Sequence, residues 1–253
     1  MDPPNTPENW YKNLPIVTKI IVTTIFIVTV AVVLGLFTPA IMLLDFGLIT
    51  ARLHLWRLFT NFFWLGGFSI HWIFQMYFLC HFSTRLENNE VFKQEPGDYL
   101  FFILIQMLTL DVLSLVLEWP RGMPVLGPSL SFAIIYYWSK REPFSYLSYW
   151  GFSLQSYQFP FALMFLNILM GGSVWTDLLG LASGHLYYFV KEILPGQYDI
   201  SFISTPGFLH SAVQTVAEKV QPRGNVIRMQ PQQAQAQAGG GFFGGRGHRL
   251  GGD

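Results

Sequence analysis

Six long apolar stretches constrain this chain of 253 residues more than any other feature. A membrane-spanning helix needs roughly 17–25 mostly apolar residues, and most of the stretches reach or approach that length. Charged residues make up 12% of the chain, about half of the 25% or so that is usual in soluble domains. We therefore predict an all-α polytopic membrane protein with spans at 14–37, 68–85, 99–117, 125–139, 152–170 and 177–194.

Composition limits the function classes that need attention. Net charge is zero, so nothing points to a nucleic-acid partner, and we predict no cofactor and no metal. The single cysteine, Cys80, excludes an intrachain disulfide. The first stretch is longer than a signal-peptide core of roughly 7–15 residues, so we expect it to stay as a signal anchor.

The connector between the first two stretches, residues 38–67, is too apolar for a solvated loop and too broken for a span. Leu48, Arg52, Leu55, Phe59 and Phe62 fall near helical spacing, beside two tryptophans. We predict an amphipathic segment lying in the membrane interface, where Trp56 anchors and Arg57 bonds phosphates or backbone carbonyls.

Lysine and arginine are unevenly divided between the two sides of a six-span protein. Before the tail, seven lie on the side of the termini and three on the other: Lys12, Lys19, Arg85, Lys93, Lys140, Arg141 and Lys191 against Arg52, Arg57 and Arg121. The positive-inside rule then places both termini in the cytosol.

The chain divides into three parts by composition. Residues 1–13 form a cytosolic N-terminal segment and residues 14–194 the membrane bundle. From residue 195 onward glutamine, alanine and glycine accumulate, so we predict that 195–253 is a disordered cytosolic tail. The fourth stretch is short and calls for a thin bilayer or for shielding inside the bundle. The fifth has a proline, Pro160, that could kink it.

Polar residues in three of the stretches form a candidate site. Gly180 and Gly184 share a helix face and let another helix approach closely, which would hold His185 in the middle of the bundle. Ser129 in the fourth stretch and His185 are the residue types that nucleophilic acyl transfer needs. Equally, such groups often only bond a neighbouring helix. Asp111 is expected to pair with a polar neighbour that the sequence does not identify.

The order of these residues resembles the rhomboid superfamily of intramembrane proteases. His71, Gln75 and Glu87 stand near the spacing of a histidine, an asparagine and a glutamate in rhomboid span two. In rhomboid span four, the catalytic serine lies in Gly-x-Ser-Gly. Here the matching position holds Gly127 rather than Ser129.

Further departures from the protease pattern resemble the Derlin family, the inactive rhomboid relatives of the endoplasmic reticulum. Bulky rings follow His185 where the protease has a glycine. Four segments carry the resemblance to Derlins: Trp10–Pro15, Leu55–Asn61, Phe63–Gly67 and Asp177–Phe189. It implies a six-span rhomboid-like bundle, without catalysis, in the endoplasmic reticulum membrane.

The resemblance also implies a function in protein quality control. Derlins act in endoplasmic-reticulum-associated degradation and the unfolded protein response, where they promote retrotranslocation of misfolded proteins by thinning the membrane or by forming a protein-conducting path. The implied partners are an AAA ATPase of the valosin-containing-protein type, a membrane ubiquitin ligase complex, misfolded substrates and the lipid bilayer. A homo-oligomer is left open.

The C-terminus carries a short motif within 241–251. Phe243, Gly245, Gly247 and Leu250 match the segment with which Derlins bind that ATPase. Apolar anchors on a flexible backbone suit binding by strand addition to a folded domain.

Two other functions remain open at this point. One is an active intramembrane serine protease that uses Ser129 and His185. The test is whether the two side chains come within hydrogen-bond reach. The other is an oligomeric channel, although the spans have no ring of like charges.

Overall fold

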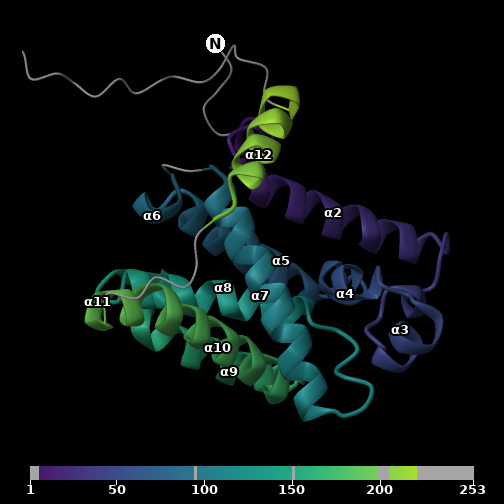
Figure 1. Ribbon diagram of the computed structural model, residues 1–253. Coiled ribbons are helices and arrows are strands. Elements are labelled where there is room, and N and C mark those ends of the chain that lie inside the picture. The colour runs from purple at the N-terminus through teal and green to yellow at the C-terminus, as the bar shows by residue number, and fades with distance from the viewer. Residues whose placement is uncertain (1–5, 94–95, 150–151, 199–204, 221–253) are drawn as a thin grey trace, which may run out of the picture.

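A computed structural model describes residues 6–93, 96–149, 152–198 and 205–220 as a bundle of helices with one short hairpin. Every one of the six apolar stretches contains a helix (Figure 1). These helices are α2 (Ile16–Val33), α5 (Ile70–Glu87), α7 (Pro96–Leu117), α8 (Gly127–Arg141), α9 (Phe159–Leu169) and α10 (Val174–Tyr188). Within the described ranges, Ile16–Val33 and Gly97–Leu117 are each long and apolar enough to cross a membrane.

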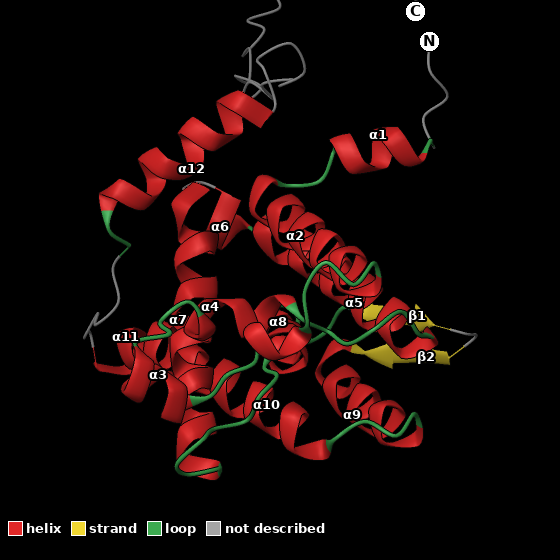
Figure 2. Cartoon of the chain, turned by 90° about the vertical axis from the view of Figure 1, so that its right-hand side faces the viewer, coloured by secondary structure: helices red, strands yellow, loops and turns green. Residues whose placement is uncertain are grey.

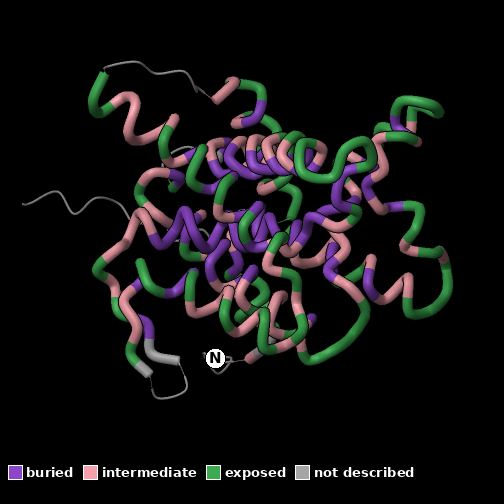
Figure 3. Tube along the Cα trace, turned by 90° about the horizontal axis from the view of Figure 1, so that it is seen from below, coloured by how far each residue is buried: buried purple, intermediate pink, exposed green. Residues whose placement is uncertain are grey.

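The helix α8 lies at the centre of the bundle. Every residue from Ser129 to Ser139 is buried, and α8 packs against α10 on one side and α5 on another. Figure 3 shows the buried residues gathered in the middle of the molecule. This short helix is therefore shielded inside the bundle, which is one of the two arrangements predicted for the fourth stretch; the other was a locally thin bilayer.

Short elements extend the bundle at its ends. They are α1 (Pro7–Lys12), α6 (Glu90–Lys93), the π-helix η4 (Phe189–Ile193) and α11 (Leu194–Tyr198). Thr6 accepts a hydrogen bond from the Asn9 amide and so caps α1. The η4 turn continues α10, where Glu192 accepts hydrogen bonds from Tyr137 and Arg141 of α8.

The connector, predicted as an amphipathic segment with residues near helical spacing, is folded into four short helices. These are η1 (Pro39–Ile41), α3 (Phe46–Arg52), α4 (Arg57–Thr60) and η2 (Asn61–Phe63). The break falls at Leu53, which has a left-handed backbone with a φ of 56°. The expected helical spacing across Leu48 to Phe62 therefore does not correspond to a continuous helix.

The fifth stretch is only partly helical, contrary to the prediction. Its first residues form β2 (Phe152–Gln155), which pairs antiparallel with β1 (Tyr146–Tyr149), and a turn η3 (Ser156–Gln158) follows (Figure 2). Pro160 lies in the first turn of α9 and does not kink it. Proline is tolerated there because that amide has no partner within a helix.

The segment predicted to be disordered contains a helix, α12 (Gly207–Val220). It lies at the end of the bundle where α2 begins (Figure 1) and packs on α7 and α2. Leu209 and Val213, four residues apart, are buried there. The glutamine- and glycine-rich residues farther along the chain obscured this apolar spacing in the sequence.

Candidate functional site

The glycine pair lies where α10 meets α8. A Cβ atom added to Gly180 would lie 2.7 Å from the Phe132 Cβ, and one added to Gly184 would lie 2.9 Å from the Ala133 carbonyl oxygen. Atoms that are not bonded to each other do not approach a Cβ atom this closely in proteins. The two glycines therefore let the backbones of α8 and α10 approach each other, as small residues do between membrane helices.

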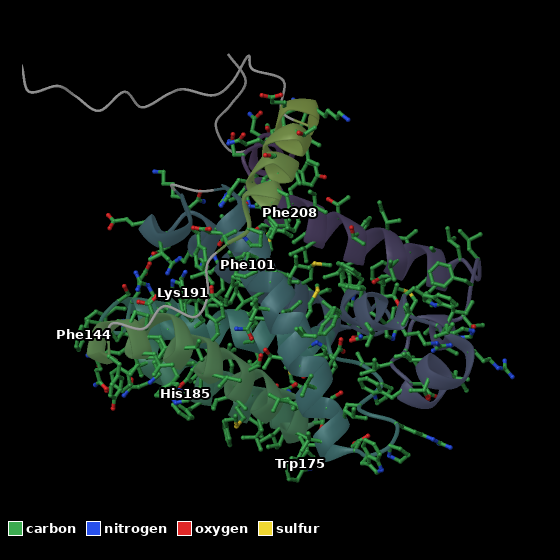
Figure 4. All side chains as sticks on the ribbon, viewed as in Figure 1. Phe101, Phe144, Trp175, His185, Lys191 and Phe208 are labelled. Carbon is green, nitrogen blue, oxygen red and sulfur yellow. The ribbon has the colours of Figure 1, made fainter. Side chains whose placement is uncertain are left out.

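His185 does not lie inside the bundle, contrary to the expectation from the sequence. It is exposed, on the edge of α10 away from α7 (Figure 4), because one residue beyond Gly184 turns the side chain by about 100° around a helix. Its Nδ1 is 2.8 Å from the Tyr136 hydroxyl. The ring therefore packs against α8 from outside.

Ser129 and His185 are not joined in the structure. The Ser129 side chain is fully buried, and its hydroxyl has no hydrogen-bond partner among the described residues. The Ser129 carbonyl faces Gly180. A serine nucleophile needs a base within about 2.6–3.2 Å, and this geometry does not supply one.

A mostly apolar cleft with a few polar side chains in its walls opens among α5, α8, α9 and α10. His71 and Gln75 line it from α5, where the Gln75 Nε2 and His71 Nε2 atoms are 2.7 Å apart. Ser131 of α8 also lines it, and its hydroxyl donates to the Gly127 carbonyl at 3.1 Å. Phe74, Phe78, Phe132 and Leu163 supply much of the remaining wall. His71 and Gln75, predicted to share a face, therefore share this cleft, whereas Ser129 is not among its lining residues.

The opposite wall holds two residues that sequence reasoning did not assign to a site. Asn167 of α9 donates a hydrogen bond to the Asp177 carboxylate of α10 at 2.8 Å, and both line the cleft. The Asn167 Oδ1 atom is buried without a hydrogen-bond partner among the described residues. The sequence signal that could have identified this pair was the presence of one polar residue in each of two apolar stretches, Asn167 in the fifth and Asp177 in the sixth.

Trp56 and Arg57 hold the connector together. Arg57 is 7% exposed, and its Nη1 atom donates to the carbonyls of Ala40 and Leu43 at 2.8 and 2.5 Å. The Trp56 indole donates to the Ile41 carbonyl at 3.3 Å. The guanidinium therefore satisfies carbonyls left open around η1 and does not point to the surface.

Asp111 is bonded to the same connector. The Asn61 side-chain nitrogen lies 3.4 Å from the Asp111 Oδ1 atom and donates to the Arg57 carbonyl at 2.7 Å. Both Asn61 and Asp111 are buried. The partner that the sequence left unnamed is thus Asn61, which ties the connector to α7.

Glu87, which took the rhomboid glutamate position in the sequence comparison, caps α2. Its carboxylate accepts from the Val17 and Thr18 amides at 3.0 and 2.8 Å and from the Thr18 hydroxyl at 2.7 Å. Free amides at a helix start need such acceptors. Glu87 therefore joins the end of α5 to the beginning of α2.

Two further predictions concern a metal site and the C-terminal motif. In the described ranges, histidine, cysteine, aspartate and glutamate form no cluster of three or more that could hold a metal ion. Phe243, Gly245, Gly247 and Leu250 lie outside the described residues.

Apolar helices pack around an enclosed α8, and two of the described helices are long and apolar enough to cross a membrane. These features define the class as a bundle of apolar helices. The chain belongs to the Der1-like family, whose sequence model matches residues 14–207. The resemblance to Derlins is thereby confirmed.

Individual relatives agree with this assignment over most of their length. The chain is 37% identical to a probable derlin-2 homolog of Dictyostelium discoideum over 206 residues, which cover 80% of this chain and 81% of that protein. It is 34% identical to Derlin-1 of Arabidopsis thaliana over 211 residues, covering 83% and 78%. With Derlin-2.1 of Zea mays it shares 30% identity over 243 residues, covering 93% and 94%.

Family membership has three direct consequences. It implies a polytopic protein of the endoplasmic reticulum membrane and a role in endoplasmic-reticulum-associated degradation. Derlins are rhomboid-like proteins that generally lack protease activity. Members typically work with the degradation machinery of that membrane.

Proposed function

We propose that this protein promotes retrotranslocation of misfolded proteins from the endoplasmic reticulum to the cytosol. The observation that carries the proposal is the cleft whose walls present His71, Gln75, Ser131, Asn167 and Asp177 among apolar helices. Moving a polar chain through hydrocarbon is costly because its backbone groups lose their hydrogen bonds. The polar side chains of the cleft offer hydrogen bonds to a substrate segment and so lower this cost.

A short helix supports a second part of the same mechanism, local thinning of the bilayer. The helix α9 has 11 residues. At 1.5 Å per residue, it is about 16 Å long, compared with a hydrocarbon layer of about 30 Å. A bilayer that adapts to short helices becomes thinner around them. In this proposal six spans cross the membrane and both termini face the cytosol.

The protein acts without peptide-bond hydrolysis in this proposal. Ser129 has no base in reach, and His185 is paired with Tyr136 at 2.8 Å on the outside of α10. Reconstituted protein should leave model rhomboid substrates intact. Cleavage that depends on Ser129 would overturn this part of the proposal and favour the intramembrane protease.

The tail recruits the force-generating partner. A peptide covering residues 241–251 should bind the amino-terminal domain of an AAA ATPase of the valosin-containing-protein type through Phe243 and Leu250. Gly245 and Gly247 let the backbone lie close to that domain. A membrane ubiquitin ligase complex would mark the emerging substrate. Equal binding by a peptide with Phe243→Ala and Leu250→Ala would remove the tail from the proposal.

The cleft itself is tested by removing its polar groups while keeping their size. Gln75→Leu and Asn167→Leu each replace a lining amide by an apolar side chain of similar volume. Thr24→Val on α2 makes a matched polar-to-apolar change outside the cleft. Each variant is expressed in cells that lack the endogenous protein, and the half-life of a misfolded reporter is measured by cycloheximide chase.

We expect both cleft variants to lengthen the reporter half-life several-fold and Thr24→Val to leave it unchanged. Steady-state levels and thermal melting of the purified variants separate loss of function from loss of folding. A double variant, Gln75→Leu with Asn167→Leu, that degrades the reporter at the wild-type rate would show that the cleft is not the substrate path.

A further inference from the structure

A second groove, away from that cleft, runs along α5 beside α1 and α2. Its volume of about 450 Å³ falls within the roughly 300–1,000 Å³ that is usual for small-molecule sites. Residues of α5 from Trp72 to Arg85 line one wall, and Trp10, Leu14 and Val22 line the other. The proposed function makes no use of this groove.

The wall formed by α5 changes from apolar to polar along its length. Trp72, Met76 and Cys80 line one part, and they are followed by His81 and Arg85. From the first to the third of these residues the helix rises about 12 Å. Half of the hydrocarbon layer of a bilayer measures about 15 Å, so the apolar part has the depth of one leaflet.

Positive charge prevails at the polar end. Arg85 is exposed and forms no ion pair within the described part of the chain. Its guanidinium lies 5.4 Å from the centre of the Trp138 ring, which leaves N–H groups available to an acceptor. The Lys19 ammonium donates to the Lys12 carbonyl at 2.9 Å, so a second cationic group lies close to the N-terminal wall.

The carboxylates near this end are already occupied. Glu8 is paired with Lys12 at 2.5 Å, and Glu87 accepts hydrogen bonds from the first turn of α2. Trp10, which is 58% exposed, has the amphipathic ring that is preferred at headgroup level. The polar end of the groove therefore combines an aromatic interface residue with the exposed guanidinium of Arg85.

We propose that this groove is a binding site for one anionic glycerophospholipid. The phosphate lies at Arg85, where the guanidinium suits phosphate geometry, and an acyl chain follows Trp72, Met76 and Cys80. Because the polar end is positively charged, we expect an anionic headgroup to bind better than a zwitterionic one. The apolar part is about as long as one leaflet is deep, which suits a single acyl chain. A bound lipid would fill the space between α5 and the N-terminal elements.

The full-length protein in detergent tests this site by native mass spectrometry. It is titrated with palmitoyl-oleoyl phosphatidylglycerol and with phosphatidylcholine of the same chains. The wild type should prefer the first lipid. Arg85→Gln should weaken phosphatidylglycerol binding about fivefold, the contribution of one basic residue near a membrane surface, with phosphatidylcholine unchanged. Arg85→Lys should keep most of the preference.

Two more variants complete the test. Lys93→Gln removes one exposed charge from α6, outside the groove, and should change neither affinity. Met76→Trp fills the apolar part and should weaken both lipids. Equal affinity in Arg85→Gln and the wild type overturns the site. So does an equal loss in Arg85→Gln and Lys93→Gln, which indicates diffuse attraction, and so does unchanged binding by Met76→Trp.

Discussion

Replacing Gly180 by alanine should destabilise the bundle although alanine is the better helix former. In an exposed helix, glycine to alanine gains about 1 kcal/mol. At Gly180 the new Cβ would lie 2.7 Å from the Phe132 Cβ and 3.1 Å from the Ala133 amide nitrogen, and it would also meet the Ser129 carbonyl oxygen. Two of these three are backbone atoms, which cannot move unless α8 moves away from α10.

Overpacking of a close-packed interior typically costs about 1–3 kcal/mol, and rigid neighbours place this site at the upper end. The gain in helix propensity offsets about 1 kcal/mol of this cost. For Gly180→Ala we therefore expect the free energy of unfolding to fall by about 1–2 kcal/mol. Gly184→Ala should cost less. Its Cβ would meet the Ala133 carbonyl oxygen at 2.9 Å and the edge of the Tyr136 ring, which can turn, at 3.1 Å.

Gly196 provides a matched control. It is a helical glycine of α11 with no atom within 4 Å of an added Cβ and is exposed, so Gly196→Ala should be neutral or slightly stabilising. Unfolding of each variant in mixed micelles with increasing sodium dodecyl sulfate, followed by circular dichroism, measures the free energy. Gly180→Ala with wild-type stability would refute the close approach of α8 and α10.

Three further predictions follow from the contacts around the connector and α2. Asn61→Ala takes the side-chain donor from Asp111 and should cost about 1–3 kcal/mol in the same unfolding assay, and an unchanged midpoint would remove that link. Glu87→Ala frees the first amides of α2, so hydrogen exchange there should accelerate by at least tenfold, whereas an unaltered rate would mean that other groups cap the helix. A cysteine at Arg52, introduced with Cys80→Ser, should react with a membrane-impermeant maleimide only from the lumenal side of microsomes, and reaction from the cytosolic side alone would reverse the topology.

Much of the bundle could be predicted because apolar stretches such as 14–37 and 99–117 are long enough to be recognised by themselves. The helices α2 and α7 lie where the sequence placed spans, within the usual uncertainty at helix ends. The glycine pair was recognisable for a similar reason: small residues four apart share a face of any helix. Helical periodicity alone fixed that face.

Features that depend on neighbours were not predictable in the same way. The side of α10 on which His185 lies follows from which face α8 covers, and no local pattern states that. Leu53 breaks the connector through a left-handed backbone that leucine rarely adopts. Asn167 and Asp177 form a pair only because α9 and α10 are adjacent.

The enclosure of α8 has a consequence for how the protein is made. Along this helix the hydroxyls of Ser131 and Ser139 donate to the carbonyls of Gly127 and Tyr136, so serines are tolerated there although they are buried. The insertion machinery, however, reads each emerging segment by its affinity for lipid. A short segment with several hydroxyl groups has little of that affinity until α5 and α10 are beside it. Biogenesis of the bundle should therefore require α8 to be retained near the machinery until α10 has been synthesised, so that truncation before α10 leaves α8 outside the membrane.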